Sequence, residues 1–252
     1  MFDLSGYVAL ITGGNGGIGL GMALALAEAG ADIAIWGTNP AKNESAAERL
    51  GQTGRQVVTS LCDVRDEDQV SRAFAEAVDR LGKVDSVFAN AGLSGRLAPF
   101  TETTLTEWRR TLAVNLDGAF LTLREGARHL VARGEGGSLV AVSSTAAIHG
   151  VPRNPQYAVS KTGLLALTRS LAVELARYGI RCNALLPGWT ETELTASGRQ
   201  NEKFFANTTY RTPLKRWAQP SEFGPAAVYL ADPRLQFHTG DAMVIDGGYT
   251  IS

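Results

Sequence analysis

Short apolar runs alternate along the whole chain with longer segments in which apolar residues recur at helical spacing. Such runs are typical of strands that are buried on both faces of a parallel sheet. The runs lie at residues 7–11, 32–36, 56–61, 84–88, 137–142, 180–186 and 242–245, and the helical segments at about 20–28, 41–51, 66–81, 105–132, 156–178 and 220–230. We therefore predict an α/β fold: a doubly wound, seven-stranded parallel sheet with helices on both faces, in a single domain over residues 1–252.

Residues 189–215 interrupt this alternation. Threonine, serine, asparagine and charged residues are mixed there with Phe204 and Phe205. A long irregular stretch in a compact protein is usually a lid or a binding loop, and the alternative is a segment that is simply mobile. We predict a substrate loop at about 189–215.

Composition narrows the classes of partner. The chain has 252 residues, is 44% apolar and carries a net charge of -1. A nearly neutral chain has no positive electrostatic potential that would attract a polyanion, so we do not expect nucleic acid as a partner. No apolar run approaches the ~20 residues of a membrane span, and the first residues do not resemble a targeting signal, so we expect no membrane association and a cytoplasmic location.

The cysteines and histidines give no sign of a metal centre. Cys62 and Cys182 each adjoin an apolar run and form no CxxC motif, which predicts buried free thiols. The histidines at 129, 149 and 238 are too scattered to form a ligand set from the sequence alone. We expect chemistry without a metal.

A glycine-rich turn joins the first predicted strand to the first helix. The stretch from Thr12 to Gly19 reads Thr-Gly-Gly-Asn-Gly-Gly-Ile-Gly, between the apolar run and the helical segment. Glycines let the backbone approach a pyrophosphate, whose charge is then met by the amides of the helix N-terminus. The turn predicts a dinucleotide site at Gly13, Asn15, Gly17, Ile18 and Gly19; a tight turn without a ligand is the alternative.

The second predicted strand ends at Gly37, Thr38 and Asn39, where a dinucleotide fold meets the adenosine ribose. An acidic residue there would bind the ribose hydroxyls of NAD, and a basic one would accept the 2′-phosphate of NADP. Thr38, Asn39 and the nearby Lys42 can donate to a phosphate, and no carboxylate stands beside them in the sequence. The pattern favours NADP over NAD, although both cofactors and an ordinary polar turn stay open.

Polar or small residues also follow three other predicted strands. The carboxyl ends of parallel strands share one edge of the sheet, where ligands bind. Asp63 and Val64 follow the third strand, with helix capping as the rival role for the carboxylates of this region. The other positions are Asn90, Ala91 and Gly92 after the fourth strand, and Ser143 and Ser144 after the fifth.

Tyr157 and Lys161 lie one helical turn apart near the start of the helix predicted at 156–178. An ammonium beside a phenol stabilises the phenolate and lowers its pKa from about 10, which would make Tyr157 a general acid or base. The same spacing also arises by chance on solvated helices. Asn115 stands amid apolar residues and must find hydrogen bonds; taken alone, it indicates a structural role.

Together these motifs resemble those of the short-chain dehydrogenase/reductase family, in the family's order and over essentially the whole chain. The resemblance rests on the cofactor loop Thr12-Gly13-x-x-x-Gly17-x-Gly19, on Asp63 as the adenine-side aspartate, and on the turn Asn90-Ala91-Gly92, preceded by Ala89 where the family often has asparagine. The family's catalytic tetrad is matched by Asn115, Ser144, Tyr157 and Lys161. The resemblance implies a Rossmann-like fold.

The resemblance also implies roles for these residues. Tyr157 would exchange the proton of the reacting oxygen, and Ser144 would hydrogen-bond that oxygen. Lys161 would lower the pKa of the phenol and bind the nicotinamide ribose, and Tyr157 would also contact the cofactor. Asn115 would hold a water that continues the proton path. The implied activity is NAD(P)-dependent interconversion of a secondary alcohol and a ketone, and a non-catalytic cofactor-binding protein on the same fold is the alternative.

The stretch Pro187-Gly188-Trp189-Thr190-Glu191-Thr192 resembles the family's turn beside the nicotinamide. Pro187, Gly188, Thr190 and Thr192 are therefore expected to contact the cofactor, with Thr192 on the carboxamide. Trp189 and His149 are candidate substrate contacts, with packing as the alternative. The resemblance further implies a homotetramer built with the predicted helices 105–132 and 156–178 and the last strand, and it leaves the small-molecule substrate open.

Overall fold

The computed structural model describes residues 2–252 and contains one parallel sheet in the order β3-β2-β1-β4-β5-β6-β7. The chain starts at the centre of the sheet, builds outward to β3, and then returns to build the other half. The strands are β1 (Val8–Thr12), β2 (Asp32–Gly37), β3 (Val57–Leu61), β4 (Ser86–Ala89), β5 (Gly137–Val142), β6 (Ile180–Pro187) and β7 (Ala242–Ile245). The prediction of a seven-stranded, doubly wound parallel sheet is confirmed.

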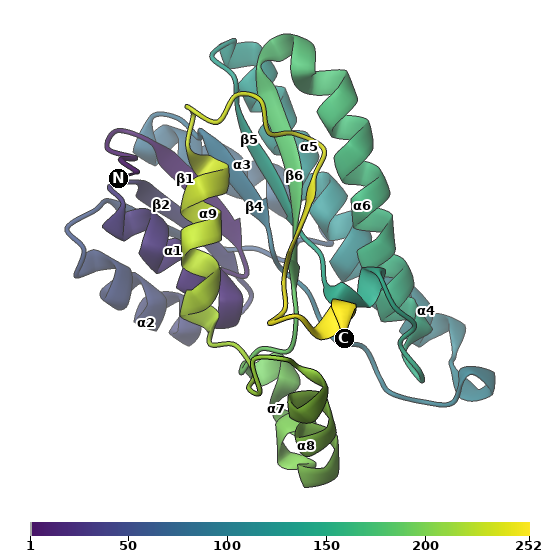
Figure 1. The fold of residues 1–252 in the computed structure, drawn as a ribbon. Coiled ribbons are helices and arrows are strands. Elements are labelled where there is room, and N and C mark those ends of the chain that lie inside the picture. The colour runs from purple at the N-terminus through teal and green to yellow at the C-terminus, as the bar shows by residue number, and fades with distance from the viewer. Residues whose placement is uncertain (1) are drawn as a thin grey trace.

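Helices cover both faces of this sheet (Figure 1). Two buried apolar clusters lie on the two faces, one with residues from α3, α5 and α6 and the other with residues from α1, α2 and α9. The helices are α1 (Gly17–Glu28), α2 (Pro40–Gly51), α3 (Glu67–Leu81), α4 (Leu105–Leu112), α5 (Gly118–Arg133), α6 (Pro155–Leu175), α7 (Ala196–Gln200), α8 (Glu202–Arg211) and α9 (Gly224–Ala231).

The segment predicted as one helix at 105–132 is two α-helices joined by a π-helical turn. The turn spans Ala113–Asp117 and contains Asn115. A π-turn inserts one residue, so it changes the direction in which the following side chains point. The prediction of a single regular helix was therefore wrong at the position of a candidate catalytic residue.

The segment predicted as an irregular loop at 189–215 contains two short helices, α7 and α8. They project beyond the carboxyl edge of the sheet (Figure 1). Trp217, just outside this segment, is buried and donates from its indole nitrogen to the hydroxyl of Thr208 at 3.0 Å. This buried anchor gives the segment regular structure that its own apolar pattern does not predict.

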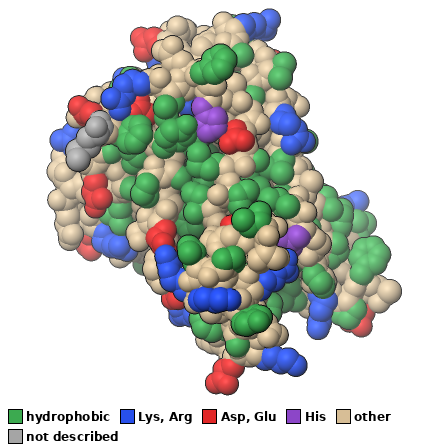
Figure 2. Space-filling view, viewed as in Figure 1, with side chains coloured by type: hydrophobic (Ala, Val, Ile, Leu, Met, Phe, Trp, Pro, Cys, Tyr) green, Lys and Arg blue, Asp and Glu red, His purple; other side chains and the backbone are tan. Residues whose placement is uncertain are grey.

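The face bearing α9 and β7 remains partly apolar on the surface. Figure 2 shows hydrophobic side chains gathered over α9 and the neighbouring β7. Val244 on β7 is 40% exposed, and Phe237 in the preceding loop is fully exposed. Because β7 is the last strand of the sheet, an apolar edge lies open at this side.

Candidate active site

The glycine turn between β1 and α1 has the shape that a pyrophosphate site needs. Gly13 and Gly17 have φ of 63° and 50°, in the left-handed region that favours glycine. A Cβ on Gly19 would lie 2.3 Å from the carbonyl oxygen of Gly13, so helix and strand approach too closely for any side chain. Gly16 caps α1 without a side chain, and the first turn of the helix holds no acidic residue. The first amides of α1 are therefore suited to an anion, and Ile18 packs beneath them against the core.

Asn15 ties this turn to the ends of β2 and β3. Its amide nitrogen donates to Asn43 Oδ1 at 2.7 Å, and the amide nitrogen of Asn43 donates to the carbonyl oxygens of Gly37 and Ser60 at 3.3 and 3.2 Å. Asn43 is buried. The network fixes the glycine turn against the region where the adenosine half of a dinucleotide binds in doubly wound folds.

The turn after β2 carries the residues expected to select the cofactor. Thr38 and Asn39 are exposed. Asn39 caps α2, because its side chain accepts from the backbone nitrogen of Lys42 at 3.1 Å. The ammonium of Lys42 pairs with the carboxylate of Glu193. No carboxylate adjoins this turn in the sequence, but the fold brings one to Lys42 from 151 residues away.

Asp63 and Val64 follow β3 but differ in exposure and role. Asp63 is half-buried and accepts from the backbone and the guanidinium of Arg65, which holds the pKa of that carboxyl below its ordinary value. Asp66 caps α3 through the backbone nitrogen of Gln69 at 3.0 Å. The capping role expected of this region thus falls to Asp66, which leaves Asp63 at the strand end. Val64 is buried against the backbone of Gly118.

The turn after β4 is fastened to the end of β1. The hydroxyl of Thr12 accepts from the backbone nitrogens of Asn90 and Ala91 at 3.0 and 2.9 Å, and the amide of Asn90 donates to the Thr12 carbonyl oxygen at 2.9 Å. A Cβ on Gly92 would lie 3.3 Å from Asn115 Oδ1 and 3.4 Å from Lys161 Nζ. This turn therefore joins the cofactor loop to two members of the candidate tetrad.

Asn115 is fully buried in the π-turn, and its side-chain amide is saturated by protein groups. Its Oδ1 accepts from the backbone nitrogen of Leu93 at 2.8 Å. Its amide nitrogen donates to the Leu93 carbonyl oxygen at 3.0 Å and to Ser160 Oγ at 3.1 Å. The side chain thus positions the loop after β4 against α6.

Ser144, Tyr157 and Lys161 meet between the end of β5 and the start of α6. Ser144 Oγ accepts from the backbone nitrogen of Ala146 at 3.1 Å, and the Ser144 side chain lies near enough to the Tyr157 hydroxyl to lower the pKa of that phenol. Lys161 is 4% exposed, and its Nζ donates to the carbonyl oxygen of Val142 at 2.9 Å and lies 5.8 Å from the centre of the Tyr157 ring. The structure thus brings together the three residues that the sequence singled out.

Burial shifts the pKa values of this group. Burial raises the pKa of Tyr157 above its ordinary value, and the hydrogen bond from Ser144 partly offsets the rise. Burial also lowers the pKa of Lys161 from 10.5 to about 8. Lys161 is not among the causes of the Tyr157 shift, so the expectation that Lys161 lowers the pKa of the phenol stays a prediction.

The stretch after β6 lies across the glycine turn. A Cβ on Gly17 would lie 3.3 Å from Thr192 Cγ2. Thr190 is buried and donates to the carbonyl oxygen of Gly188 at 3.0 Å. Pro187 ends β6, so Gly188, Thr190 and Thr192 follow the carboxyl end of that strand, and Thr192 reaches the glycine turn.

Aromatic side chains hold the substrate loop to the rest of the site. Trp189 stacks on Trp217 with ring centres 5.2 Å apart, and Phe204 meets Trp189 edge to face at 5.1 Å. Tyr249 lies 6.3 Å from Trp189 and 5.7 Å from the ring of His149. Trp189 therefore has the packing role that was its alternative, although it remains half-buried. Sequence reasoning missed Trp217 and Tyr249, because neither stands in a motif.

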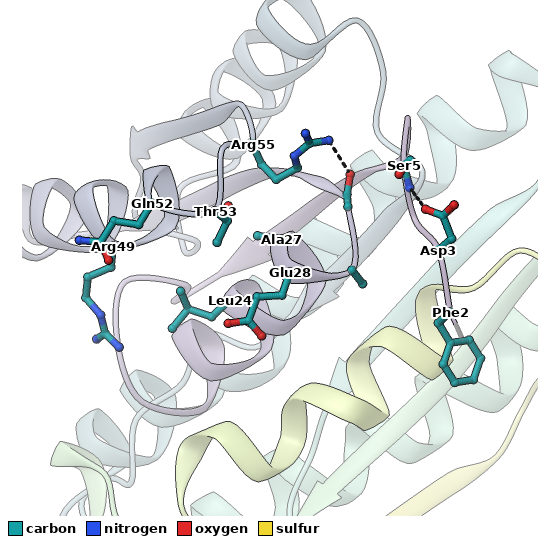
Figure 3. A pocket seen from close by; sticks show the side chains of 12 residues that line it. Phe2, Asp3, Ser5, Leu24, Ala27, Glu28, Arg49, Gln52, Thr53 and Arg55 are labelled. Carbon is teal, nitrogen blue, oxygen red and sulfur yellow. Dashed lines mark hydrogen bonds between the residues drawn. The ribbon is translucent and has the colours of Figure 1, made fainter.

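A surface hollow elsewhere offers no rival site. Its volume is about 880 Å³, and it lies at the amino end of β1 and β2, between the ends of α1 and α2 (Figure 3). Its charged side chains are of both signs: Asp3 and Glu28 against Arg49 and Arg55. Arg55 donates to the backbone of Gly30 rather than into the hollow. Mixed charge and wide exposure give no convergent set of groups for one ligand.

Two further candidate functions find no basis in the part of the chain that the structure describes. Between residues 2 and 252, no group of three or more histidine, cysteine, aspartate or glutamate side chains could hold a metal ion. Over the same residues, no helix has both the length and the apolar character needed to cross a membrane.

Known proteins resemble this chain over its full length. Residues 13–250 match the family described as Enoyl-(Acyl carrier protein) reductase. The 5-keto-D-gluconate 5-reductase of Escherichia coli (strain K12) is 35% identical, with 100% of this chain and 98% of that protein covered. The galactitol 2-dehydrogenase of Cereibacter sphaeroides is 36% identical at the same coverage.

Solved structures agree in fold. The structure of the gluconate 5-dehydrogenase of Burkholderia cenocepacia J2315, in complex with NADP and tartrate, matches with a TM-score of 0.94 at 37% sequence identity. The match covers 100% of this chain and 98% of that one. A short-chain type dehydrogenase/reductase from Mycobacterium marinum has a TM-score of 0.94 at 34% identity and the same coverage. These relatives are named as enzymes, which disfavours the non-catalytic alternative. The chain belongs to the short-chain dehydrogenase/reductase family of oxidoreductases.

Proposed function

We propose that this protein transfers hydride between NADP(H) or NAD(H) and a small hydroxylated substrate, interconverting a secondary alcohol and a ketone at Tyr157. The observation that carries the proposal is the meeting of Ser144, Tyr157 and Lys161 beside a glycine turn that admits a pyrophosphate. A hydroxyl that exchanges protons beside a hydride-transfer site is what alcohol and ketone chemistry requires.

Each residue has a defined task in this proposal. Tyr157 gives its proton to the carbonyl oxygen during reduction, or takes the proton of the alcohol during oxidation. Ser144 donates a hydrogen bond to the same oxygen and stabilises its negative charge as it develops. Lys161 holds the nicotinamide ribose, and Asn115 positions the loop after β4 and the start of α6. The bound nicotinamide supplies or accepts the hydride.

The cofactor would be held by the groups at the carboxyl edge of the sheet. The amides of α1 would meet the pyrophosphate, with Gly13, Gly17 and Gly19 allowing its approach. Asp63 and Val64 would flank the adenine, and Thr38 and Asn39 the adenosine ribose. Asn90, Ala91 and Gly92 would lie under the dinucleotide, with Pro187, Gly188, Thr190 and Thr192 beside the nicotinamide. NADP is favoured, as in the Burkholderia cenocepacia structure.

The relatives narrow the class of substrate to test. They include enzymes named for 5-keto-D-gluconate, galactitol and cis-4-hydroxycyclohexanecarboxylate. We propose a substrate of similar size with several polar groups, bound between His149 and the substrate loop at 189–215. Nε2 of His149 is buried and makes no hydrogen bond within the described chain, whereas Nδ1 contacts the Gly150 carbonyl oxygen at 3.2 Å, so a substrate hydroxyl can pair with Nε2.

The test is a coupled screen of the purified protein with NADPH and NADH against ketones and with NADP⁺ and NAD⁺ against alcohols, including those named for the relatives. Turnover should fall at least about 10²-fold in Tyr157→Phe, because the proton donor is lost. Tyr178→Phe, in the partly exposed 3₁₀ turn Ala176–Tyr178 that follows α6, is the matched control and should keep full activity. Full activity in Tyr157→Phe would refute the assigned role.

We further propose a cytoplasmic homotetramer. Support comes from the apolar edge at β7 and from Phe120, Val159 and Val173, which are 42%, 44% and 83% exposed on α5 and α6. The free, buried thiols of Cys62 and Cys182 suit a reducing compartment. Sedimentation should give four times 26.7 kDa, and a stable monomer would refute the assembly. Recovery of the native protein outside the cytoplasmic fraction would refute the location.

A further inference from the structure

One ion pair joins the two rims of the proposed cofactor groove. Lys42 lies in the first turn of α2, directly after β2, and Glu193 begins the short 3₁₀ turn Glu193–Thr195 of the substrate loop. The two residues are 151 positions apart in the chain. The pair therefore connects the adenosine side of the groove to the segment that covers the substrate.

Lys42 lies just beyond the end of β2, in the first turn of α2. In doubly wound folds the adenosine ribose meets the end of the second strand, and a basic side chain there accepts the phosphate of NADP. Asn39 already caps α2 with its side chain, so Lys42 supplies the positive charge of this turn. In the structure, that ammonium is engaged by a carboxylate.

The position of Glu193 is set by its neighbours and not by Lys42 alone. Thr192 rests on Gly17, as its Cγ2 lies 3.3 Å from where a Cβ on that glycine would be. The backbone nitrogen of Thr192 donates to Thr195 Oγ1 at 3.1 Å, and Thr195 Oγ1 donates to the carbonyl oxygen of Thr190. These bonds present Glu193 to α2 on an ordered turn.

We infer that Glu193, a residue of the substrate loop, determines cofactor preference by competing with the 2′-phosphate for Lys42. The inference rests on the proposed function. A phosphate monoester carries about −1.5 to −2 charges near pH 7, against −1 for a carboxylate, so it is the stronger partner for the ammonium. The Lys42 and Glu193 side chains are 44% and 82% exposed, and ion pairs that exposed are weak enough to be displaced.

The two cofactors would leave Glu193 in different states. NADP(H) would displace the Glu193 carboxylate from Lys42, whereas NAD(H), which has no 2′-phosphate, would leave the pair intact. The turn that carries Glu193 keeps the hydrogen bonds among Thr190, Thr192 and Thr195 in both cases.

The experiment measures the dissociation constants of NADPH and NADH by nucleotide fluorescence, for the wild type, Glu193→Gln, Lys42→Met and the double variant. Glu193→Gln should bind NADPH about 2- to 5-fold more tightly, because an exposed competing charge is removed. Its affinity for NADH should stay within about twofold of the wild type or weaken. Lys42→Met should weaken NADPH about tenfold and leave NADH nearly unchanged.

The double variant separates competition from simple repulsion. If Glu193 acts through Lys42, Glu193→Gln gains less than about twofold in NADPH affinity when Lys42 is already methionine, because no ammonium is left to release. An equal gain in both backgrounds would overturn the inference and indicate direct repulsion of the phosphate. Glu202→Gln is the matched control, an exposed glutamate on α8 of the same loop, and should change neither affinity.

The failure of this inference is distinct from failure of the proposed function. If Glu193→Gln binds NADPH with the wild-type affinity, Glu193 does not compete for Lys42, but the proposed dinucleotide site still stands. Wild-type protein that binds neither NADPH nor NADH would overturn the dinucleotide site itself, and with it the inference. The gain in Glu193→Gln should also shrink as salt is raised, since the pair is exposed and screened.

Discussion

Lys161→Met should make the protein inactive and more stable at neutral pH. Lys161 is 4% exposed, and burial lowers its pKa from 10.5 to about 8. At 1.36 kcal/mol for each pKa unit, the buried ammonium destabilises the folded protein by about 3 kcal/mol where it is charged in both states. Methionine has a similar length and removes the charge, but it leaves the Val142 carbonyl oxygen without its 2.9 Å bond, at a cost of about 1 kcal/mol.

The free energy of unfolding of Lys161→Met should therefore exceed that of the wild type by about 2 kcal/mol at pH 7. For a chain of this size, that difference raises the melting temperature by about 5 °C. Its sign depends on pH in a defined way. Below pH 8, Lys161 is charged in the folded and the unfolded states, so the penalty is complete. From pH 8 to 10.5 the unfolded chain holds a proton that the folded protein has lost, so the wild type gains stability relative to the variant until the penalty disappears.

The assay is thermal unfolding of cofactor-free protein at pH 7, 8, 9 and 10, followed by circular dichroism. Lys203→Met, on an exposed position of α8, removes a charge without relieving burial and should leave the melting temperature unchanged. A Lys161→Met protein that is less stable than the wild type at pH 7 would contradict the reasoning. So would a stability gap that does not narrow between pH 8 and pH 10.

Three other substitutions probe the site. Ser144→Ala removes the side chain that lowers the pKa of Tyr157, so the pH profile of alcohol oxidation should move to higher pH. The rate should also fall by about 10²-fold. An unmoved pH profile would contradict this. Gly19→Ala should lower the free energy of unfolding by about 2 kcal/mol and impair cofactor binding, because the added Cβ would overlap the Gly13 carbonyl oxygen. Gly16→Ala is the control: the added carbon has open space around it, so this variant should unfold at the wild-type temperature. Asn115→Leu should lower the free energy of unfolding, measured by chemical denaturation, by at least about 2 kcal/mol, because the backbone N–H and C=O of Leu93 both lose their partner. A decrease below about 0.5 kcal/mol would show that these contacts are dispensable.

The sheet was predictable because its strands are short, apolar and punctuated by glycine and polar turns. The run at 180–186 corresponds to β6, and the turn at Thr12 to Gly19 lies between β1 and α1 as expected. Apolar periodicity reports burial and not hydrogen-bond register, so it could not reveal the π-turn at Ala113–Asp117. That turn coincides with the bonds of Asn115 to Leu93 and Ser160, which are tertiary contacts.

The candidate site was predictable in its members but not in its electrostatics. Tyr157 and Lys161 were found from their spacing and family pattern, yet their pKa values depend on burial, which depends on the whole fold. Glu193 escaped notice because its partner is distant in sequence. Motifs identify groups that recur in a known pattern, whereas a distant pair outside any motif, such as Lys42 and Glu193, needs the three-dimensional structure.

The strand order described above has a consequence for how activity appears during folding. Because β4 returns to the side of β1, the turn after β4 can dock on Thr12 only once these two strands, 78 residues apart at this contact, have paired. Contacts of such long sequence separation form slowly. During refolding, helical signal should therefore recover before nucleotide binding, and nucleotide binding should report the step in which β4 joins β1.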